Sequence, residues 1–244
     1  MISKNQFKFI RQLEQKKHRR REGLFVAEGT KVVGDLMKRY QPKMLFATAE
    51  YLQTFPRLTN VVEVTPDELQ HISFQQHPQQ VLALFPIPET PVSDINQDVL
   101  SLALDGVQDP GNLGTIIRIA DWFGIENIYC SEDTVDAWNP KVVQATMGSI
   151  ARVNIIYTNL PEMLDALPSS FPVYGTFLDG ENIYQQSLSE KGLIIMGNEG
   201  NGISEAVRSR ITHRLLIPSF RQGDTAESLN VAIATAITCS EFRR

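Results

Sequence analysis

The chain of 244 residues lacks several features on which other classes of protein depend. It has two cysteines, Cys130 and Cys239, and four histidines but no C-x-x-C pair, which argues against a disulfide framework or a metal site. No apolar stretch approaches the length of a membrane-spanning helix, and the opening segment MISKNQFKFIRQLEQKKHRRR has no apolar run of the secretory kind. We therefore expect a cytoplasmic protein with no membrane partner and no metal.

An excess of positive charge is also missing, because the formal net charge is −5 at pH 7. The distribution is uneven, however. Residues 1–40 hold eleven Lys and Arg against four Asp and Glu, whereas residues 41–244 hold twelve against twenty-four. The densest basic cluster is KKHRRR at residues 16–21. A basic end on an acidic chain indicates a polyanionic partner, although a solvated helical face would give the same pattern.

The first third of the chain alternates short helical and short apolar patterns. They predict helices at 5–15, 30–39 and 66–71 and strands at 24–27, 44–47, 61–64 and 80–85. This order indicates a small α/β domain, which we place at residues 1–88. The proline-rich segment PIPETP follows, and we take residues 89–97 as a stiff linker to a second domain at 98–244.

The second domain also alternates strands and helices. Strands are predicted at 99–104, 127–129, 153–157, 172–177, 192–196 and 215–218, and helices at 115–123, 141–147, 160–167, 203–209 and 228–242. Such an order predicts a parallel sheet with helices on both faces. Ligands of these sheets bind beyond the carboxyl ends of the strands, where the loops 105–114, 197–202 and 219–227 lie.

The last predicted helix, SLNVAIATAITCSEF, is apolar on nearly every side. A helix of this kind is buried all round, so we expect it in a core, at a subunit interface or in both. Ser228 stands at its start as the expected N-cap. A polar loop beside a helix N-terminus is a natural site for a small molecule.

Common nucleotide-binding motifs do not match these loops. GNEGNG has glycines at 197, 200 and 202, which is not G-x-G-x-x-G, and it follows a late strand. PGNLGT lacks the Lys-Ser/Thr pair of a P-loop. The histidines are scattered, and no Ser-His-Asp order or metal-ligand cluster is visible.

The three loops instead offer a set of polar side chains, which are Asn112, Arg118, Asn198, Glu199, Ser228 and Asn230. The amides and the hydroxyl could equally serve as helix caps or turn residues. Arg118 differs, because its neighbours Ile117 and Ile119 are apolar and arginine is rarely buried unpaired. Either a carboxylate such as Glu199 pairs with it or it faces an anionic ligand.

Together these residues resemble the SpoU (TrmH-like) branch of the SPOUT RNA methyltransferases. The first family motif, N-x-G-x-x-x-R, corresponds to NLGTIIR at 112–118. The second, an apolar strand followed by G-N/S-E-x-x-G, corresponds to 194–202, and the third, I-P followed by S-L-N-V, to 217–218 and 228–231. Order and spacing agree across 98–244. The first domain is similar to the L30e-like RNA-binding domain that often precedes this fold, with a looser match at GLFVAEG.

The resemblance implies a trefoil-knotted α/β domain and a homodimer with the last helix at the subunit interface. It also implies that S-adenosylmethionine binds in the knot and that a methyl group is transferred to a ribose 2′-hydroxyl of RNA, which excludes DNA. Ribosomal RNA is favoured over transfer RNA, while the nucleotide, and any role in antibiotic resistance, stay open. The implied cofactor contacts are Thr176, Met196, Gly197, Asn198, Gly200, Ile217 and Leu229.

By the same resemblance, Arg118 of the partner subunit would reach the hydroxyl. The side chains that would orient it, the cofactor or the ribose are Asn112, Glu199, Ser228 and Asn230. Because a guanidinium stays protonated, we expect Arg118 to bind a phosphate and stabilise the developing alkoxide instead of acting as a base. The RNA would dock through its phosphates on Lys16, Lys17, Arg19, Arg20 and Arg21.

The segment SFRQGDTAE at 219–227 is longer and more polar than the usual loop of this family. It places in doubt the shape of the adenine side of the pocket or of the rim that meets RNA. The alternative function is a non-catalytic RNA-binding or ribosome-assembly protein on the same fold. A nucleotide-dependent oxidoreductase is a more distant one. The intact Arg118, Glu199 and residues 228–230 favour the enzyme.

Overall fold

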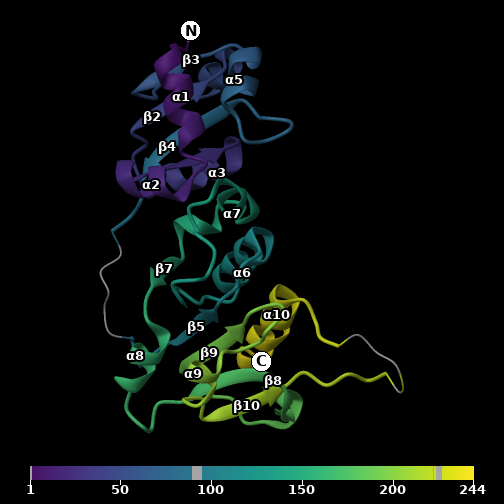
Figure 1. Ribbon diagram of the computed structural model, residues 1–244. Coiled ribbons are helices and arrows are strands. Elements are labelled where there is room, and N and C mark those ends of the chain that lie inside the picture. Colours follow the sequence, from purple (N-terminus) through teal and green to yellow (C-terminus); the bar gives the residue numbers. More distant parts are fainter. Residues whose placement is uncertain (1, 90–94, 222, 224–226) are drawn as a thin grey trace. The chain divides into compact units, whose positions relative to one another are not determined.

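The computed structural model of the chain describes residues 2–89, 95–221, 223 and 227–244 (Figure 1). The chain folds into two compact units. The first comprises residues up to 89 together with 136–151, and the second comprises 90–135 with 152–244. The segment 136–151, which lies inside the predicted second domain, therefore packs with the first unit. The core of the expected linker, residues 90–94, is outside the described residues.

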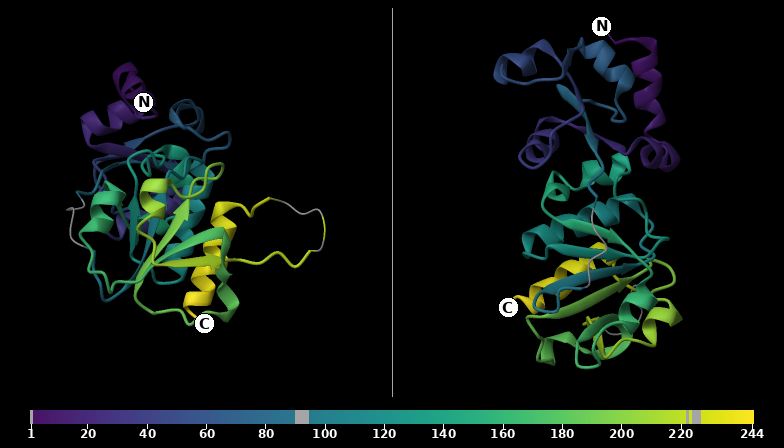
Figure 2. Two further views of the ribbon diagram at one scale, coloured as in Figure 1. Left: turned by 60° about the horizontal axis from the view of Figure 1, so that its bottom comes forward. Right: turned by 90° about the vertical axis from the view of Figure 1, so that its left-hand side faces the viewer.

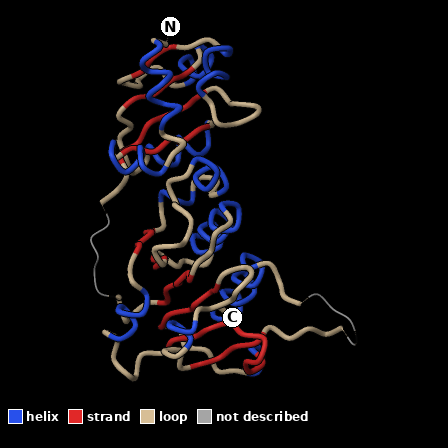
Figure 3. The backbone as a smooth tube through the Cα atoms, in the orientation of Figure 1, coloured by secondary structure: helices blue, strands red, loops and turns tan. Residues whose placement is uncertain are grey.

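Within the described residues, the first unit is built on a four-stranded sheet with the order β1-β4-β2-β3 (Figure 3). The elements are α1 (Lys4–Gln12), α2 (Lys16–Glu22), β1 (Leu24–Glu28), α3 (Thr30–Met37), β2 (Met44–Ala47), α4 (Ala49–Thr54), β3 (Val61–Glu63), α5 (Pro66–Ile72) and β4 (Val81–Pro86). Strand β4 runs antiparallel to β1 and β2, while β2 and β3 are parallel. Helices α2 and α4 have no counterpart among the predicted elements. Helix α2, KKHRRRE, contains no apolar residue and therefore shows no apolar period.

Both sides of the first sheet are covered, since every residue of β1 is buried. Val26 belongs to a core with Ile10 of α1 on one side. On the other side the ring of Phe25 lies 4.7 Å from that of Trp138, centroid to centroid. Trp138 is part of the segment 136–151, which also supplies α7 (Pro140–Ala145) and the 3-10 turn η1 (Ser149–Ala151). This segment thus completes the core of the first unit.

The described part of the second unit contains a sheet of parallel strands in the order β10-β8-β9-β5-β6-β7 (Figure 1 and Figure 2). The strands are β5 (Leu100–Asp105), β6 (Asn127–Cys130), β7 (Asn154–Tyr157), β8 (Val173–Asn182), β9 (Gly192–Gly197) and β10 (His213–Leu216). The helices are α6 (Pro110–Trp122), α8 (Leu160–Asp165), α9 (Glu205–Arg208) and α10 (Val231–Phe242), with a 3-10 turn η2 (Ile183–Gln185). The predicted parallel sheet is confirmed.

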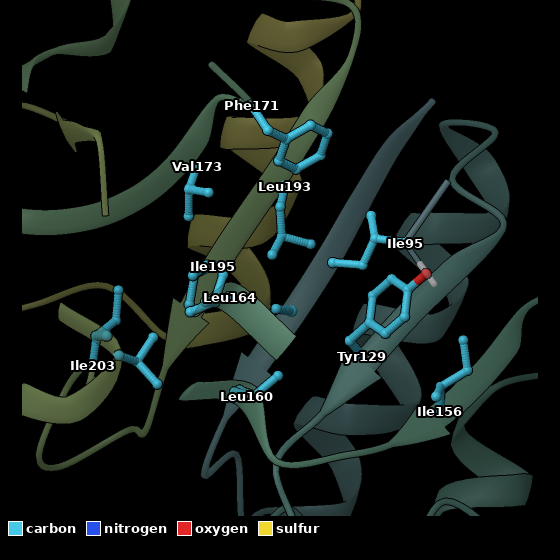
Figure 4. Close-up of a cluster of buried hydrophobic side chains, with 12 residues drawn as sticks. Ile95, Tyr129, Ile156, Leu160, Leu164, Phe171, Val173, Leu193, Ile195 and Ile203 are labelled. Carbon is cyan, nitrogen blue, oxygen red and sulfur yellow. The ribbon is translucent and has the colours of Figure 1, made fainter. Parts of the chain in front are cut away.

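The central strands β5 and β9 are buried along their whole length, because both faces of the sheet are covered. On one face, Ala103 of β5 and Ile195 of β9 share a core with Leu160 of α8 and Val207 of α9 (Figure 4). Side chains alternate along a strand, so Ile194 points to the other face. That face is covered by α10, which contacts β9 and α6.

Helices α6 and α10 lie side by side and run in the same direction. At their N-terminal ends, Asn230 Nδ2 donates to Asn112 Oδ1 at 2.9 Å. At their C-terminal ends, Arg243 Nε donates to the carbonyl of Phe123 at 3.0 Å. The starts of both helices are therefore held at the same edge of the sheet.

Both helices begin at residues other than those predicted. Helix α6 begins at Pro110, because the side chain of Asp109 accepts from the N–H of Asn112 at 2.8 Å and caps the helix. Helix α10 begins at Val231, and its N-cap is Asn230. The prediction that Ser228 caps this helix is wrong, because Asn230 accepts the first-turn N–H groups itself.

Helix α10 is buried on one side only within this chain. Val231, Thr235 and Cys239 are buried, whereas Ile233 is 52% exposed. One side of this apolar helix therefore packs against the core, and the other side is an exposed apolar surface. No described helix combines the length and hydropathy that crossing a membrane requires.

Candidate active site

A pocket lies where the carboxyl ends of the central strands meet. Strands β5 and β9 pair in register up to Asp105 and Gly197. The loop after β9, the second half of β8 and the segment that leads into α10 enclose a cavity of about 490 Å³. Such a volume is typical of a site for a small molecule or cofactor.

The pocket brings together all seven side chains or backbones that the sequence suggested as cofactor contacts. They are Thr176, Met196, Gly197, Asn198, Gly200, Ile217 and Leu229. Two of the suggested catalytic residues, Glu199 and Ser228, also line it. The described lining does not include Asn112, Arg118 or Asn230. Residues 222 and 224–226 of the long loop are outside the described residues.

One wall of the pocket is an interruption in the pairing of β8. Strand β10 pairs with β8 at Gly175 and next at Glu181, so the residues between them are left out of this ladder. All of those residues except Gly180 line the pocket. Gly180 allows this path, because a Cβ at this position would collide with the backbone of Leu215. The irregular pairing thus creates the wall.

The two glycines suggested as cofactor contacts differ in what they permit. A Cβ on Gly197 would collide with the backbone of Gly202 and Ile203, so the loop itself requires glycine there. A Cβ on Gly200 would meet only the side chain of Asn198, at 3.6 Å. Gly200 is therefore not required by packing, and the missing side chain leaves space beside the pocket.

Asn198 fixes the loop after β9. Its backbone pairs with that of Gly202 at 2.9 and 3.0 Å, and its Oδ1 accepts from the N–H groups of Gly200 and Asn201, both at 2.9 Å. Its Nδ2 donates to the carbonyl of Gly106 at 2.7 Å. The same side chain therefore closes its own loop and binds it to the loop after β5.

A chain of hydrogen bonds links Glu199, Asn112 and Asn230. The Glu199 carboxylate accepts from the N–H groups of Gln108 and Asp109, both at 3.2 Å, and from Asn112 Nδ2 at 2.9 Å. Asn112 Oδ1 accepts from Asn230 Nδ2, and Asn230 Oδ1 caps α10. Because a carboxylate only accepts, each amide in the chain has one consistent orientation. Three loops are thereby tied together.

The same contacts determine the protonation of Glu199. Partial burial raises its pKa, but the hydrogen bonds from the Asn112 side chain and from the backbone N–H groups of Gln108 and Asp109 outweigh burial. The pKa of Glu199 consequently lies below its ordinary value. The carboxylate is therefore ionised near neutral pH, where it suits a role in holding the loop and is a poor proton acceptor.

Arg118 lies on the exposed side of α6. The opposite side of this helix carries the buried residues Leu113, Ile117 and Ala120. Within the described residues Arg118 has no hydrogen bond and no ion pair. The suggested pairing with Glu199 is wrong, because that carboxylate is occupied by N–H donors. Arg118 thus points outward with its donors available to another molecule.

Arg19, suggested as an RNA contact, is a core residue of the first unit and is 1% exposed. Its guanidinium donates to the Asp136 carboxylate at 2.5 and 2.9 Å and to the carbonyls of Leu13 and Glu14 at 2.8 and 2.6 Å. The prediction is wrong for this residue, because a guanidinium buried with three partners cannot reach a phosphate. The exposed members of the cluster are Lys17, Arg20 and Arg21, while Lys16 is half-buried.

Other pocket residues carry no signal in the sequence motifs. Phe177, Asp179 and Arg208 line the cavity. The only trace of Phe177 and Asp179 is the segment FLDG, which begins at the end of the predicted strand 172–177. Arg208 lies within the predicted helix 203–209, and no motif singles it out. In the described part of the chain, no group of three or more His, Cys, Asp and Glu side chains is placed to hold a metal. Burial raises the pKa of Cys239 to about 12, so this thiol is inert.

Comparison with known proteins gives consistent matches along the chain. Residues 99–240 match the family described as SpoU rRNA Methylase, and residues 4–83 match the MRM3-like substrate binding domain. The 23S rRNA (guanosine(2553)-2'-O)-methyltransferase of Bacillus subtilis is 32% identical over 247 residues, which cover 99% of this chain and 97% of that protein.

Solved structures agree over the whole chain. A TrmH-family protein from Porphyromonas gingivalis has 44% sequence identity and a TM-score of 0.89, and the match covers 100% of this chain and 98% of that one. The AdoMet-bound rRNA methyltransferase from Sinorhizobium meliloti has 33% identity and a TM-score of 0.86, with 100% and 96% covered.

Proposed function

The chain belongs to the SpoU rRNA methylase family and is an S-adenosylmethionine-dependent RNA 2′-O-ribose methyltransferase, and we propose that its substrate is ribosomal RNA. Ribosomal RNA is preferred over transfer RNA because the similarity to the Bacillus subtilis 23S rRNA enzyme extends over nearly the full length of both chains. The observation that carries the proposal is the pocket itself, in which the second and third sequence motifs converge at the strand ends.

The residues of this pocket fit S-adenosylmethionine. Met196, Ile217 and Leu229 offer apolar surface, while Thr176 and Asn198 offer polar atoms. The open space at Gly200 allows close approach to the backbone. When bound, the cofactor supplies a methyl group on a positively charged sulfur. The protein has to hold the ribose hydroxyl in line with that methyl group, which is largely a problem of positioning.

Arg118 supplies the positive charge in this proposal. The guanidinium cannot accept the proton of the hydroxyl, because it stays protonated in proteins. Its free donors suit a phosphate beside the target ribose and the negative charge that develops on the 2′-oxygen. Glu199 and Asn112 position the loops on which the cofactor and the ribose rest, and Asn230 joins this arrangement to α10.

We further propose a homodimer in which Arg118 of one subunit completes the pocket of the other. Arg118 lies outside the described lining of the pocket in its own chain. Two exposed apolar side chains, Trp122 of α6 at 85% and Ile233 of α10 at 52%, lie on neighbouring helices and offer a surface for a second copy. The trefoil knot implied by the family is also part of the proposal.

The division of labour between domains follows. Residues 1–88 would dock RNA through the exposed Lys17, Arg20 and Arg21 and the half-buried Lys16, and residues 98–244 would hold the cofactor and carry out the transfer. Residues 4–83, which match a substrate-binding domain, support the first role. We propose the cytoplasm as the location.

The first experiment is transfer of labelled methyl from S-adenosylmethionine to ribosomal RNA from cells that lack this gene. Free RNA, ribosomal precursor particles and transfer RNA are tested in parallel, and the product is mapped by nuclease digestion. We expect one labelled ribose 2′-oxygen in ribosomal RNA. Label in transfer RNA alone would contradict the proposed substrate. RNA binding without label in any sample would favour the non-catalytic alternative.

The second experiment tests the shared active site with two inactive variants. Arg118→Ala removes the guanidinium, and Gly200→Trp fills the pocket at a position where packing tolerates a side chain. After subunit exchange in an equal mixture, half the dimers are mixed and each has one complete site, so about a quarter of the wild-type activity returns. A mixture that stays inactive, with both variants dimeric, would show that Arg118 acts within its own chain.

A further inference from the structure

Two arginines beside the pocket share one aromatic ring and one carboxylate. The Cζ atoms of Arg208 and Arg214 lie 4.9 and 4.3 Å from the ring centroid of Phe177. Arg208 Nη2 donates to Asp179 Oδ2 at 3.4 Å, and Arg214 Nη2 donates to Asp179 Oδ1 at 2.5 Å. These four residues are called the rim cluster below.

The rim cluster exists because of the irregular pairing of β8. Phe177 and Asp179 belong to the stretch that is left out of the ladder, and Arg214 pairs with Gly175 immediately before it. Arg208 is the last residue of α9. Because Phe177, Asp179 and Arg208 all line the pocket, the cluster is part of its rim. A strand with regular pairing would not bring these side chains together.

The rim cluster has a net positive charge. Two guanidinium groups face one carboxylate, and within the described part of the chain Asp179 is the sole group to which either guanidinium donates. Each guanidinium has five N–H donors, so most donors are available. The side chains of Arg208 and Arg214 are 37% and 38% exposed. The Phe177 ring and Asp179 hold both groups in place before any ligand arrives.

We propose that the rim cluster binds a phosphate of the RNA substrate next to the ribose that is methylated, an inference that rests on the proposed function. The planar guanidinium fork matches the oxygens of a phosphate. Leu178, which is 73% exposed and also lines the pocket, adds an apolar surface against which an unpaired base can pack. Arg208 and Arg214 are thus positioning residues that place the ribose at the pocket.

Arg210 provides a matched control. It is two residues from Arg208, its side chain is 31% exposed, and it forms a bidentate ion pair with Asp165 at 2.7 and 2.6 Å. It is not among the residues that line the pocket. Arg210→Gln therefore removes one positive charge, the ion pair with Asp165 and the hydrogen bond to the carbonyl of Ala206, while every side chain of the rim cluster stays in place.

The test compares the double variant Arg208→Gln/Arg214→Gln with Arg210→Gln in the full-length protein. The probe is ribosomal RNA from cells that lack this gene, and its dissociation constant is measured over a range of salt concentrations. For the double variant we expect RNA affinity to fall about tenfold at low salt, and the slope of log K against log salt to decrease by about 0.7 for each lost phosphate contact. The affinity for S-adenosylmethionine and the behaviour of Arg210→Gln should match wild type.

Three results would overturn the proposal. They are unchanged RNA affinity in the double variant, an equal loss in Arg210→Gln, and weakened S-adenosylmethionine binding with unchanged RNA binding, which would assign the cluster to the cofactor. Should the double variant fail to fold, Arg214→Lys keeps the charge without the fork, and wild-type RNA affinity in that variant would also contradict the proposal. Equilibrium binding needs no turnover, so absence of methyl transfer by the wild type would contradict only the proposed function.

Discussion

Two arginines, one in each unit of the chain, occupy opposite environments. Arg19 of α2 is buried, and its guanidinium donates to the Asp136 carboxylate and to two backbone carbonyls. Arg118 of α6 is exposed and has no partner among the described residues. A buried charge must be satisfied by its own protein, whereas an exposed charge with free donors remains available to a ligand. The difference separates an arginine that holds a unit together from one that is available for chemistry.

Removing the guanidinium of Arg19 should lower stability, whereas removing that of Arg118 should lower turnover. The largest effect is expected for the stability of the Arg19 variant. Arg19→Ala leaves the Asp136 carboxylate and two carbonyls without their partner, so the free energy of unfolding should fall by about 3–5 kcal/mol. Arg118→Ala breaks no hydrogen bond or ion pair among the described residues and should change the free energy of unfolding by less than about 0.5 kcal/mol. Denaturant unfolding measures both. Equal losses would remove the contrast between the two residues.

Turnover should respond in the opposite order. Arg118→Ala should lower kcat by about 10²–10³-fold, the usual cost of removing one group that stabilises developing negative charge. The dissociation constant of S-adenosylmethionine should change little, because the proposed role of Arg118 is to bind the phosphate and the 2′-oxygen of the RNA, and Arg118 is not part of the described cofactor pocket in its own chain. The comparison is with Arg19→Met, whose folded fraction should retain wild-type kcat. Full activity of Arg118→Ala would contradict the assigned role.

A smaller effect is expected in the hydrogen-bond chain that supports the pocket. Asn112→Asp places a second carboxylate against Glu199 and removes the donor of the 2.9 Å bond, which should cost about 1–3 kcal/mol in transition-state stabilisation. Adding Glu199→Gln supplies a donor in the reverse direction and should restore part of kcat/KM. A double variant as poor as the sum of the single variants would show that the two side chains act independently.

The smallest effects concern two carboxyl groups whose pKa values move in opposite directions. Burial raises the pKa of Glu28 in the first unit, against hydrogen bonds from Ser73 and the N–H of Phe74. The pKa of Glu199 is lowered, since hydrogen bonding outweighs its partial burial. Stability contributed by Glu28 is therefore present below its unfolded pKa and lost as pH rises through its folded pKa. The contribution of Glu199 is present above its unfolded pKa and lost as pH falls.

These signs can be read from unfolding free energies between acid and neutral pH. As pH rises, the free energy of unfolding of wild type should fall relative to that of Glu28→Gln. Over the same range it should rise relative to that of Glu199→Gln. Slopes of the same sign would show that one carboxyl group has a different environment in solution.

Most strands of the second unit could be predicted from the sequence, because short apolar runs mark them. Five strands are predicted within one or two residues of their observed ends, because each is a short apolar run bounded by turn residues. The sixth, β8, is predicted to end at residue 177, but it extends to Asn182 because its pairing resumes at Glu181. Its irregular stretch, and with it the rim cluster, depends on β10 and leaves no local pattern.

The start of α10 and the orientation of Arg118 on α6 could not be predicted from neighbouring residues in the sequence. Ser228 is a reasonable N-cap by residue type, yet Asn230 takes this role while its Nδ2 bonds to Asn112, 118 residues earlier in the chain. Likewise Arg118 has apolar neighbours in the sequence, but the helical period of 3.6 residues turns it away from Leu113, Ile117 and Ala120. Neighbours in the sequence are not neighbours on a helix face.

The sequence by itself determined the order of the strands, most of the helices, the location of the three motifs and the family, because these depend on residue types within short windows; α2 and α4 were not predicted. Only the tertiary structure decided that Arg19 is buried against Asp136, that the segment 136–151 completes the first unit, and that Glu199 reaches Asn112. The partners in these side-chain contacts are 117 and 87 residues apart. Such contacts form only when folding brings distant segments together, and no pattern within either segment specifies the partner.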